Sequence, residues 1–386
     1  MSVRLSIIAC LLFTYSVQAQ DTATFFFATR QCRDSVTNKL RTTIEEVIRL
    51  PLTDSTAREW NGACWAMELM LYRPAKLQEL VPGHLRTLPE LETSLQRSYL
   101  EMIYTLYPGR FNKQMQQLLP LLKNEKVRAM AWEYLFLMEP GADYEKDTAF
   151  RKSVYFEPFR YQRNKPLVKQ PRINDFTKKS FLPGQTVLCS FQAADRNKPG
   201  YLMIRTEEGK WMCDEKGTPL RFPQLARSIT NLPFYLTNGN TPQGLYKITG
   251  TAVSVNPWIG PTFNLQMELP FETGTATFFS NDSSYLDFYK GLLGSPLEAY
   301  DGLYESFIAG KLGRSEIIAH GTTIDPGFYR NKPYYPNTPS LGCLCSPETW
   351  NDQGKRISST QADWMTLYLE LKNKPQYLIV AEIHMD

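Results

Sequence analysis

Histidine is scarce in this chain of 386 residues, which contains three: His84, His320 and His384. A zinc site of the usual kind needs clustered His, Cys or carboxylate ligands, and the close pair Cys343 and Cys345 has no second cluster to join. Both common phosphate-binding Gly-rich spacings and the G-x-S-x-G motif are also missing. We therefore expect no metal ion and no organic cofactor.

The chain also lacks a charge excess of either sign, because 43 basic residues face 39 acidic ones. Without a basic excess or a recognition motif, the sequence gives no reason to expect nucleic-acid binding. Beyond the N-terminal segment, no stretch approaches the ~20 apolar residues that a membrane-spanning helix needs. Hydrophobic residues at 42% indicate an ordinary globular protein, and 386 residues predict two domains.

Residues 1–19 have the pattern of a secretory signal peptide. Arg4 precedes an apolar stretch over residues 5–15, and small residues stand first and third before a cut after Ala19. A lipoprotein with Cys10 as the lipidated residue is the alternative, but the apolar segment before Cys10 is short. We expect the mature protein to be periplasmic, attached to the cell envelope or secreted.

Six cysteines would remain after signal removal, in a compartment that favours disulfides. Plausible pairings are Cys32 with Cys64 and Cys189 with Cys213. Cys343 and Cys345 are one residue apart, and disulfide geometry would strain so short a bridge. We expect Cys343 to be a free thiol and leave the partner of Cys345 open.

Residues 20–143 have apolar side chains at helical spacing, punctuated by prolines. Short connections between the segments predict an antiparallel helical array. The expected helices cover residues 37–50, 54–72, 88–106, 112–122 and 125–138. This array is either a docking surface for an envelope protein or a scaffold. His84, in a Pro-Gly-His sequence, is expected on the surface.

Residues 144–183 are basic and proline-rich, and residues 184–386 change to a period of two. The basic segment suits contact with anionic envelope polymers or, as we favour, a solvated connection. Expected strands cover residues 186–191, 200–206, 210–214, 233–236, 244–250, 251–255, 263–269, 275–279 and 377–383. Helices are expected at 287–292 and after a capping box of Ser358 and Gln361. The fold class is therefore α+β multidomain, with a mostly-β sandwich or barrel second.

A cysteine and a histidine are the remaining candidates for chemistry. The apolar pair at 317–318 leads to His320, and Cys343 follows small residues on a loop rich in proline and tyrosine. A thiol with an ordinary pKa of ~8.5 needs a neighbouring base to become a nucleophile. Gly342 leaves backbone N–H groups uncovered, where they can receive a developing oxyanion. The alternative for His320 is a structural residue at a strand end.

Three stretches of the chain together resemble the L,D-transpeptidase (YkuD-type) catalytic domain. They are IAHGT at 318–322, SLGCL at 340–344 and TPQGLYKI at 241–248. The family signature reads His-Gly-x, a loop, then Ser/Thr-His-Gly-Cys-hydrophobic-Arg, preceded by a Thr-Pro-x-Gly-x-Tyr/Phe strand. The resemblance covers roughly residues 181–386, and the helical region has no counterpart in it.

The resemblance implies an exported enzyme that acts on peptidoglycan tetrapeptide stems without a cofactor. Cys343 would attack the carbonyl of the third stem residue, expel D-Ala and form a thioester. An amine would resolve the thioester as a cross-link, and water would make the protein an L,D-carboxypeptidase. His320 is the implied base. The implied substrate and oxyanion residues are Gly342, Ser340, Gly321, Thr322 and Tyr335. Tyr335 would line the groove with Tyr329 and Tyr334, although packing of these tyrosines on the barrel is the simpler account.

Two positions depart from the family signature. Leu341 replaces its second histidine, and Cys345 replaces the arginine two residues after the nucleophile, which removes a positive charge. The loop between His320 and Ser340 is also longer. These departures predict altered substrate, altered acceptor or lost activity. The alternative to an enzyme is a non-catalytic envelope binding or scaffold protein with a degenerate domain.

Overall fold

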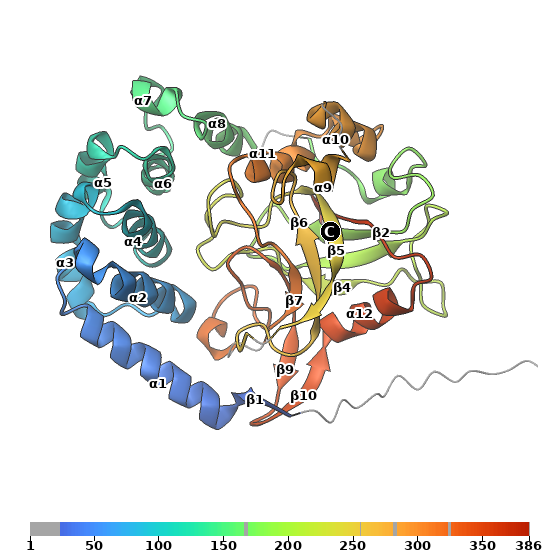
Figure 1. Ribbon diagram of the computed structural model, residues 1–386, viewed down its shortest axis with the longest axis horizontal. Helices are drawn as coiled ribbons and strands as arrows, with labels where there is room; N and C mark the ends of the chain where they lie inside the picture. Colours follow the sequence, from blue (N-terminus) through green and yellow to red (C-terminus); the bar gives the residue numbers. More distant parts are fainter. Residues whose placement is uncertain (1–23, 166–168, 255, 281–283, 323–325, 386) are drawn as a thin grey trace, which may run out of the picture.

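The structure is a computed structural model that describes residues 24–165, 169–254, 256–280, 284–322 and 326–385. The predicted signal peptide lies outside these ranges. Within them, no helix has both the length and the apolar character needed to cross a membrane. An arc of helices stands beside a β-rich, barrel-like body in Figure 1.

The N-terminal region is helical, as predicted. Its helices are α1 (Arg30–Val47), α2 (Ala57–Met70), α3 (Ala75–Thr87), α4 (Thr93–Leu106), α5 (Asn112–Leu118) and α6 (Glu125–Phe136). Side-chain caps fix two of the starts: Thr29 accepts from the Cys32 N–H at 3.3 Å, and Asn124 accepts from the Val127 N–H at 3.1 Å. The buried faces of α2 and α4 meet around Trp60, which is fully buried.

Helix α3 was not predicted, because Pro82 lies inside it. Proline removes one helical hydrogen bond, but Leu77 and Leu85 on the same helix face are buried in the core and offset that loss. His84 is therefore half-buried rather than on the surface. Its Nδ1 lies 2.8 Å from the Tyr99 hydroxyl, and burial lowers its pKa.

The basic segment after residue 143 differs from the solvated connection that we expected. It forms α7 (Thr148–Arg151) and α8 (Phe156–Asn164), and it packs onto α6. Phe150 and Phe159 are fully buried, and Arg163 lies over the Phe159 ring at 4.6 Å. The aromatic residues between the basic ones form a buried face, so residues 144–164 extend the helical region.

The second region is built on one eight-stranded sheet in the order β4-β3-β2-β11-β5-β6-β7-β8. Its strands are β2 (Val187–Gln192), β3 (Gly200–Arg205), β4 (Phe222–Gln224), β5 (Gly244–Val253), β6 (Phe263–Glu268), β7 (Ala319–Gly321), β8 (Leu344–Ser346) and β11 (Tyr377–Glu382). Leu225, just after β4, exchanges backbone hydrogen bonds of 2.8 and 2.9 Å with Cys345 in β8. The two edges of the sheet thereby meet, which gives the barrel-like form and confirms the α+β class.

A small sheet joins the start of the helical region to two strands of the second region, in the order β1 (Thr24–Thr29), β10 (Gln353–Ser359) and β9 (Glu348–Trp350). The helices around the barrel are α9 (Thr275–Phe279), α10 (Tyr285–Leu293), α11 (Glu305–Lys311) and α12 (Thr360–Glu370). Three strand predictions were wrong: 275–279 is helical, 233–236 forms turns, and 210–214 makes only isolated bridges. Helix α12 is capped by Ser359, one residue after the predicted cap.

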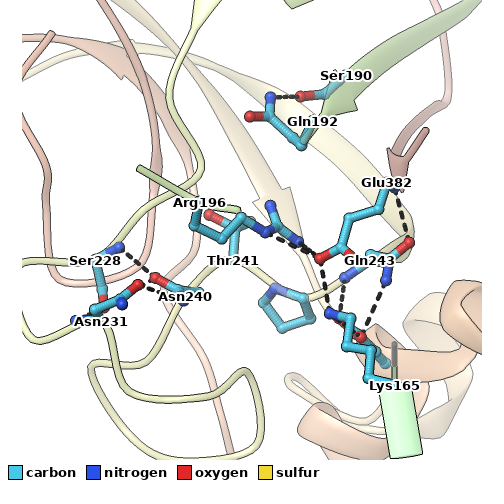
Figure 2. A network of polar contacts seen from close by, with 12 residues as sticks. Lys165, Ser190, Gln192, Arg196, Ser228, Asn231, Asn240, Thr241, Gln243 and Glu382 are labelled. Carbon is cyan, nitrogen blue, oxygen red and sulfur yellow. Dashed lines mark hydrogen bonds and ion pairs between the residues drawn. The ribbon is translucent and has the colours of Figure 1, made fainter. Parts of the chain in front are cut away.

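A buried ionic network fastens the helical region to the barrel (Figure 2). Lys165, at the end of α8, lies 2.8 Å from the Glu305 carboxylate and 2.7 Å from Glu382 on β11. Arg196 reaches Glu382 at 2.9 Å, and Gln243 hydrogen-bonds to both carboxylate-bearing residues. Both carboxylates are almost completely buried, so the cations compensate charges that water does not reach.

The six cysteines of the described chain are all free thiols. The pairings suggested for Cys32 with Cys64 and for Cys189 with Cys213 are therefore not formed in this structure. Cys343 is a free thiol, as expected.

Candidate active site

Parallel pairing of β7 with β8 brings the two halves of the predicted site together. The register pairs Ala319 with Leu344 and His320 with Cys345. This register sets Cys345 beside His320, and Cys343 stands immediately before β8, two residues away. A single strand pairing thus brings together two residues, His320 and Cys343, that are separated by 22 others in sequence.

His320 is buried, with 5% of its surface exposed, and its ring orientation is fixed by its own strand. Nδ1 lies 2.6 Å from the Gly321 carbonyl oxygen. A carbonyl oxygen only accepts, so Nδ1 carries the proton and donates it. Nε2 therefore has the free lone pair of the neutral ring, and it is the nitrogen that can accept a proton.

The Cys345 thiol is the group that contacts the Nε2 lone pair of His320 directly. Its sulfur lies 3.6 Å from Nε2 of His320, and the side chain is buried. Burial raises the pKa of the Cys345 thiol to about 12, so it stays protonated and donates. Cys345 is thus a hydrogen-bond donor to His320. Because its thiol is inaccessible, it is a poor nucleophile.

Cys343 is the accessible cysteine of the pair. It is half-buried, and its thiol lies 3.5 Å from the Glu316 carbonyl oxygen. Burial lowers the pKa of His320, but interactions with the Cys343 thiol, the Gly321 carbonyl and Glu348 outweigh it and raise that pKa overall. The Cys343 thiol therefore lies within interaction range of the imidazole while donating to a backbone carbonyl.

The loop before Cys343 is organised by Ser340. The Ser340 hydroxyl donates to the Cys343 carbonyl at 3.1 Å and accepts from the Gly342 N–H at 3.2 Å. The Gly342 N–H, predicted as an oxyanion donor, is thus already engaged within the loop. Among the described residues, the Cys343 N–H has no hydrogen-bond partner, so it is the donor left for an oxyanion.

Arg314 is a functional candidate that sequence reasoning missed. Its buried guanidinium donates to the carbonyl oxygens of Phe234 at 2.6 Å, Asn240 at 2.8 Å and Gly239 at 3.0 Å. A Cβ atom on Gly342 would come within 2.4 Å of its Nη2, so this glycine, at φ 122°, allows the close approach. Burial lowers the pKa of Arg314 to about 10, opposed by neighbours that include Cys343. Arg314 thereby places a positive charge against the loop that carries Cys343. The arginine of the family signature is replaced by Cys345 in this chain.

Glu348 on β9 is a second unpredicted neighbour of the base. One of its oxygens accepts from Ser359 at 2.6 Å and from the Thr262 hydroxyl, while Oε2 has no hydrogen-bond partner within the described chain. Burial raises its pKa above the ordinary value. A Cβ atom on Gly321 would come within 2.2 Å of the Glu348 carboxyl group, so Gly321 permits this contact behind His320.

The remaining predicted residues lie around the loop in different environments. Thr322 is buried beside β7, whereas Tyr335 is 41% exposed and stays a candidate for contact with substrate. Tyr329 and Tyr334 are buried instead, and the Tyr329 hydroxyl donates to the Leu69 carbonyl of α2 at 2.7 Å. These two tyrosines fasten the long loop to the helical region.

The helical region also holds the segment that precedes β5. The Asn238 amide donates to Glu101 at 2.9 Å, and Lys126 reaches the Thr237 hydroxyl at 3.1 Å. Thr241, at the other end of this segment, donates to the Gly342 carbonyl at 2.8 Å. The helices therefore support the backbone on which the Cys343 loop rests.

No group of three or more His, Cys, Asp or Glu side chains in the described ranges is placed to hold a metal ion. The chemistry available to the site is that of a thiol, an imidazole, a buried guanidinium and a buried carboxyl group. None of the protein-family models, curated proteins and solved structures compared with this chain matches it.

Proposed function

We propose that the protein is an exported cysteine acyltransferase of the L,D-transpeptidase type, acting on peptidoglycan tetrapeptide stems. The single observation that supports this most is the orientation of His320, whose Nδ1–H donates to the Gly321 carbonyl at 2.6 Å. That bond leaves Nε2 as a base on the side of Cys343, an accessible thiol. This orientation supports proton transfer from the Cys343 sulfur to Nε2 of His320 once the thiol leaves the Glu316 carbonyl.

In the proposed first step, the Cys343 thiol turns from the Glu316 carbonyl and gives its proton to Nε2 of His320. The resulting thiolate attacks the carbonyl carbon of the third stem residue, and a tetrahedral oxyanion forms near the Cys343 N–H. The imidazolium is stabilised by the Gly321 carbonyl and by Glu348, while Arg314 offsets the negative charge on sulfur.

Collapse of this intermediate breaks the peptide bond and leaves a thioester on Cys343. The imidazolium of His320 returns its proton to the departing D-Ala amine. An amine of a second stem then attacks the thioester, with His320 again accepting a proton, and forms a cross-link. Water in place of the amine makes the same site an L,D-carboxypeptidase.

Treatment with a carbapenem followed by intact-mass measurement tests the proposal. A covalent adduct of one carbapenem, mapped to Cys343 and missing in Cys343→Ala, is expected. Cys345→Ala is the matched control, because it removes a buried thiol two residues away and should still form the adduct. Absence of any adduct, together with no D-Ala release from tetrapeptide muropeptides, would contradict the proposal.

The second candidate function is a non-catalytic envelope binding or scaffold protein. The observation that favours it is the 3.6 Å contact between Cys345 and Nε2, which occupies the base in this conformation. This alternative predicts that Cys343→Ala changes no cellular phenotype while deletion of the helical region does. The two candidates are therefore separated by comparing those two strains.

A further inference from the structure

A cleft of about 280 Å³ opens between two connections of the helical region, and neither Cys343 nor His320 lines it. One wall is the start of α3, with Arg73 before it and Gln78 in its second turn, and the other is the α4–α5 connection, with Tyr107 and Arg110. Figure 1 places α3 on the side of the helical arc that faces away from the barrel. The proposed acyl transfer makes no use of this cleft.

The cleft is positively charged. Its lining, all within the described residues, contains two arginines and no acidic side chain. The Arg73 guanidinium lies over the Tyr107 ring, 6.0 Å from its centroid. When the Gln78 amide oxygen faces Arg110, it accepts hydrogen bonds from the Arg110 guanidinium. These bonds orient the guanidinium. Guanidinium groups held in this way suit planar, bidentate acceptors such as carboxylate and phosphate.

The N-terminus of α3 adds a partial positive charge to the same wall. Pro74 occupies the N-cap position. In this helix, which is described in full, no side chain caps the N-terminus and the first turn contains no acidic residue. The first N–H groups of a helix favour anions.

A buried hydroxyl without a partner is the independent observation that points to a ligand. Tyr107 is 5% exposed, yet its hydroxyl has no hydrogen-bond partner among the described residues. Buried polar atoms are almost always satisfied, so an orphan at a cleft calls for an explanation. Burial raises the pKa of Tyr107, while the positive charges of Arg73 and Arg110, which line the same cleft, lower it.

We propose that this cleft binds an oxyanion, carboxylate or phosphate, through Arg73, Arg110 and the Tyr107 hydroxyl. The guanidinium groups of Arg73 and Arg110 would supply positive charge and paired N–H donors. The Tyr107 hydroxyl, which has no hydrogen-bond partner among the described residues of the free protein, would donate a hydrogen bond to the bound anion. This site would give the helical region a ligand of its own, separate from the cysteine site.

Calorimetric titration of the whole protein at constant ionic strength tests the proposal, with inorganic phosphate and N-acetyl-D-alanyl-D-alanine as separate probes. Saturable binding of at least one probe is expected, weakened about tenfold by Tyr107→Phe, which removes only the hydroxyl. The double variant Arg73→Gln/Arg110→Gln should weaken binding at least tenfold. Arg86→Gln, an exposed arginine on the same helix, should bind as the native chain does.

The two probes distinguish a phosphate-bearing ligand from a carboxylate-bearing one, and binding of either supports an oxyanion site. Cys343→Ala should bind equally well, so failure of the proposed catalysis would not affect this outcome. Absence of saturable binding by both probes, or equal dissociation constants for the native chain and the Tyr107 and arginine variants, would overturn the proposal.

Discussion

The position of the ring proton on Nδ1 determines which nitrogen of His320 can act as a base. Because Nδ1 donates its hydrogen bond to the Gly321 carbonyl, the lone pair on Nε2 is left free and lies 3.6 Å from the Cys345 sulfur in β8. Cys345, two positions after the proposed nucleophile Cys343, is the residue that contacts this lone pair directly. An arginine there would have supplied charge, whereas the buried thiol supplies a weak hydrogen bond.

Replacing Cys343 with alanine should lower the pKa of His320. In the native chain burial lowers this pKa, but the Cys343 thiol is the largest of the interactions that raise it above the ordinary value of ~6.5. A histidine whose pKa is higher folded than unfolded stabilises the protein below its unfolded pKa, and that stability is lost as pH rises through the folded value. Proton NMR resolves the three histidines, and equal His320 midpoints in both proteins would contradict the interaction.

Arg314→Gln should destabilise the protein and slow D-Ala release. The substitution leaves buried carbonyls of Phe234, Gly239 and Asn240 without their donor, which should cost about 2–4 kcal/mol in the free energy of unfolding. Urea denaturation measures that loss. Arg58→Gln, an exposed arginine on α2, serves as the control, and an equal midpoint for both variants would count against the assigned role of Arg314.

The sequence predicts His320 and Cys343 because chemistry and spacing are local properties. Arg314 and Glu348 could not be found that way, since each meets the site only through tertiary contacts, Arg314 at Gly342 and Glu348 at Gly321. Cys345 had a readable signal: a short strand at 344–346, paired with the strand that carries His320, would have placed the Cys345 thiol beside the imidazole.

At the scale of elements, the long loop between β7 and β8 is held at the helical region by tyrosines. Its tyrosines divide into the buried Tyr329 and Tyr334 and the exposed Tyr335. Composition alone does not distinguish these environments, because the partner surface comes from α2, over 250 residues earlier in the chain. The same limit explains the wrong strand at 275–279, whose alternating pattern is short enough to fit either structure.

Tyr329→Phe should loosen the loop. Loss of the hydroxyl leaves the Leu69 carbonyl in a buried position without this donor, which should reduce the free energy of unfolding by about 1–2 kcal/mol. Hydrogen exchange of the loop amides should increase in parallel. Tyr335→Phe is the matched control, because the Tyr335 ring is exposed. If it reduced the free energy of unfolding as much as Tyr329→Phe does, the buried hydrogen bond of Tyr329 would not be what stabilises the loop.

At the scale of the whole molecule, two regions share one core. A single cluster of buried side chains runs from helices α2 and α4 to strands β2 and β11, including Trp60, Tyr99, Leu188 and Val380. The predicted class, helices first and β-rich second, is confirmed. The continuity of the core was not predicted, because the basic composition of residues 144–164 concealed the buried aromatic face that joins the regions.

Lys165→Ala should destabilise the junction of these regions. The carboxylates of Glu305 and Glu382 would remain buried with less compensating charge, and removing one partner of a buried ion pair costs about 3–5 kcal/mol. Thermal denaturation should show a large fall in the midpoint. Lys146→Ala breaks an exposed pair with Asp143 and should leave the midpoint unchanged; similar midpoints for both variants would contradict the role of the buried network.

Release of D-alanine from tetrapeptide muropeptides, followed by mass spectrometry of the enzyme, tests the central claim most directly. The claim is that His320 ionises Cys343 for attack on a stem peptide. The native protein and Cys345→Ala should release D-alanine and show an acyl group on Cys343, whereas Cys343→Ala and His320→Asn should show neither. Equal release by the native protein and Cys343→Ala, or none by a folded native protein, would contradict the account.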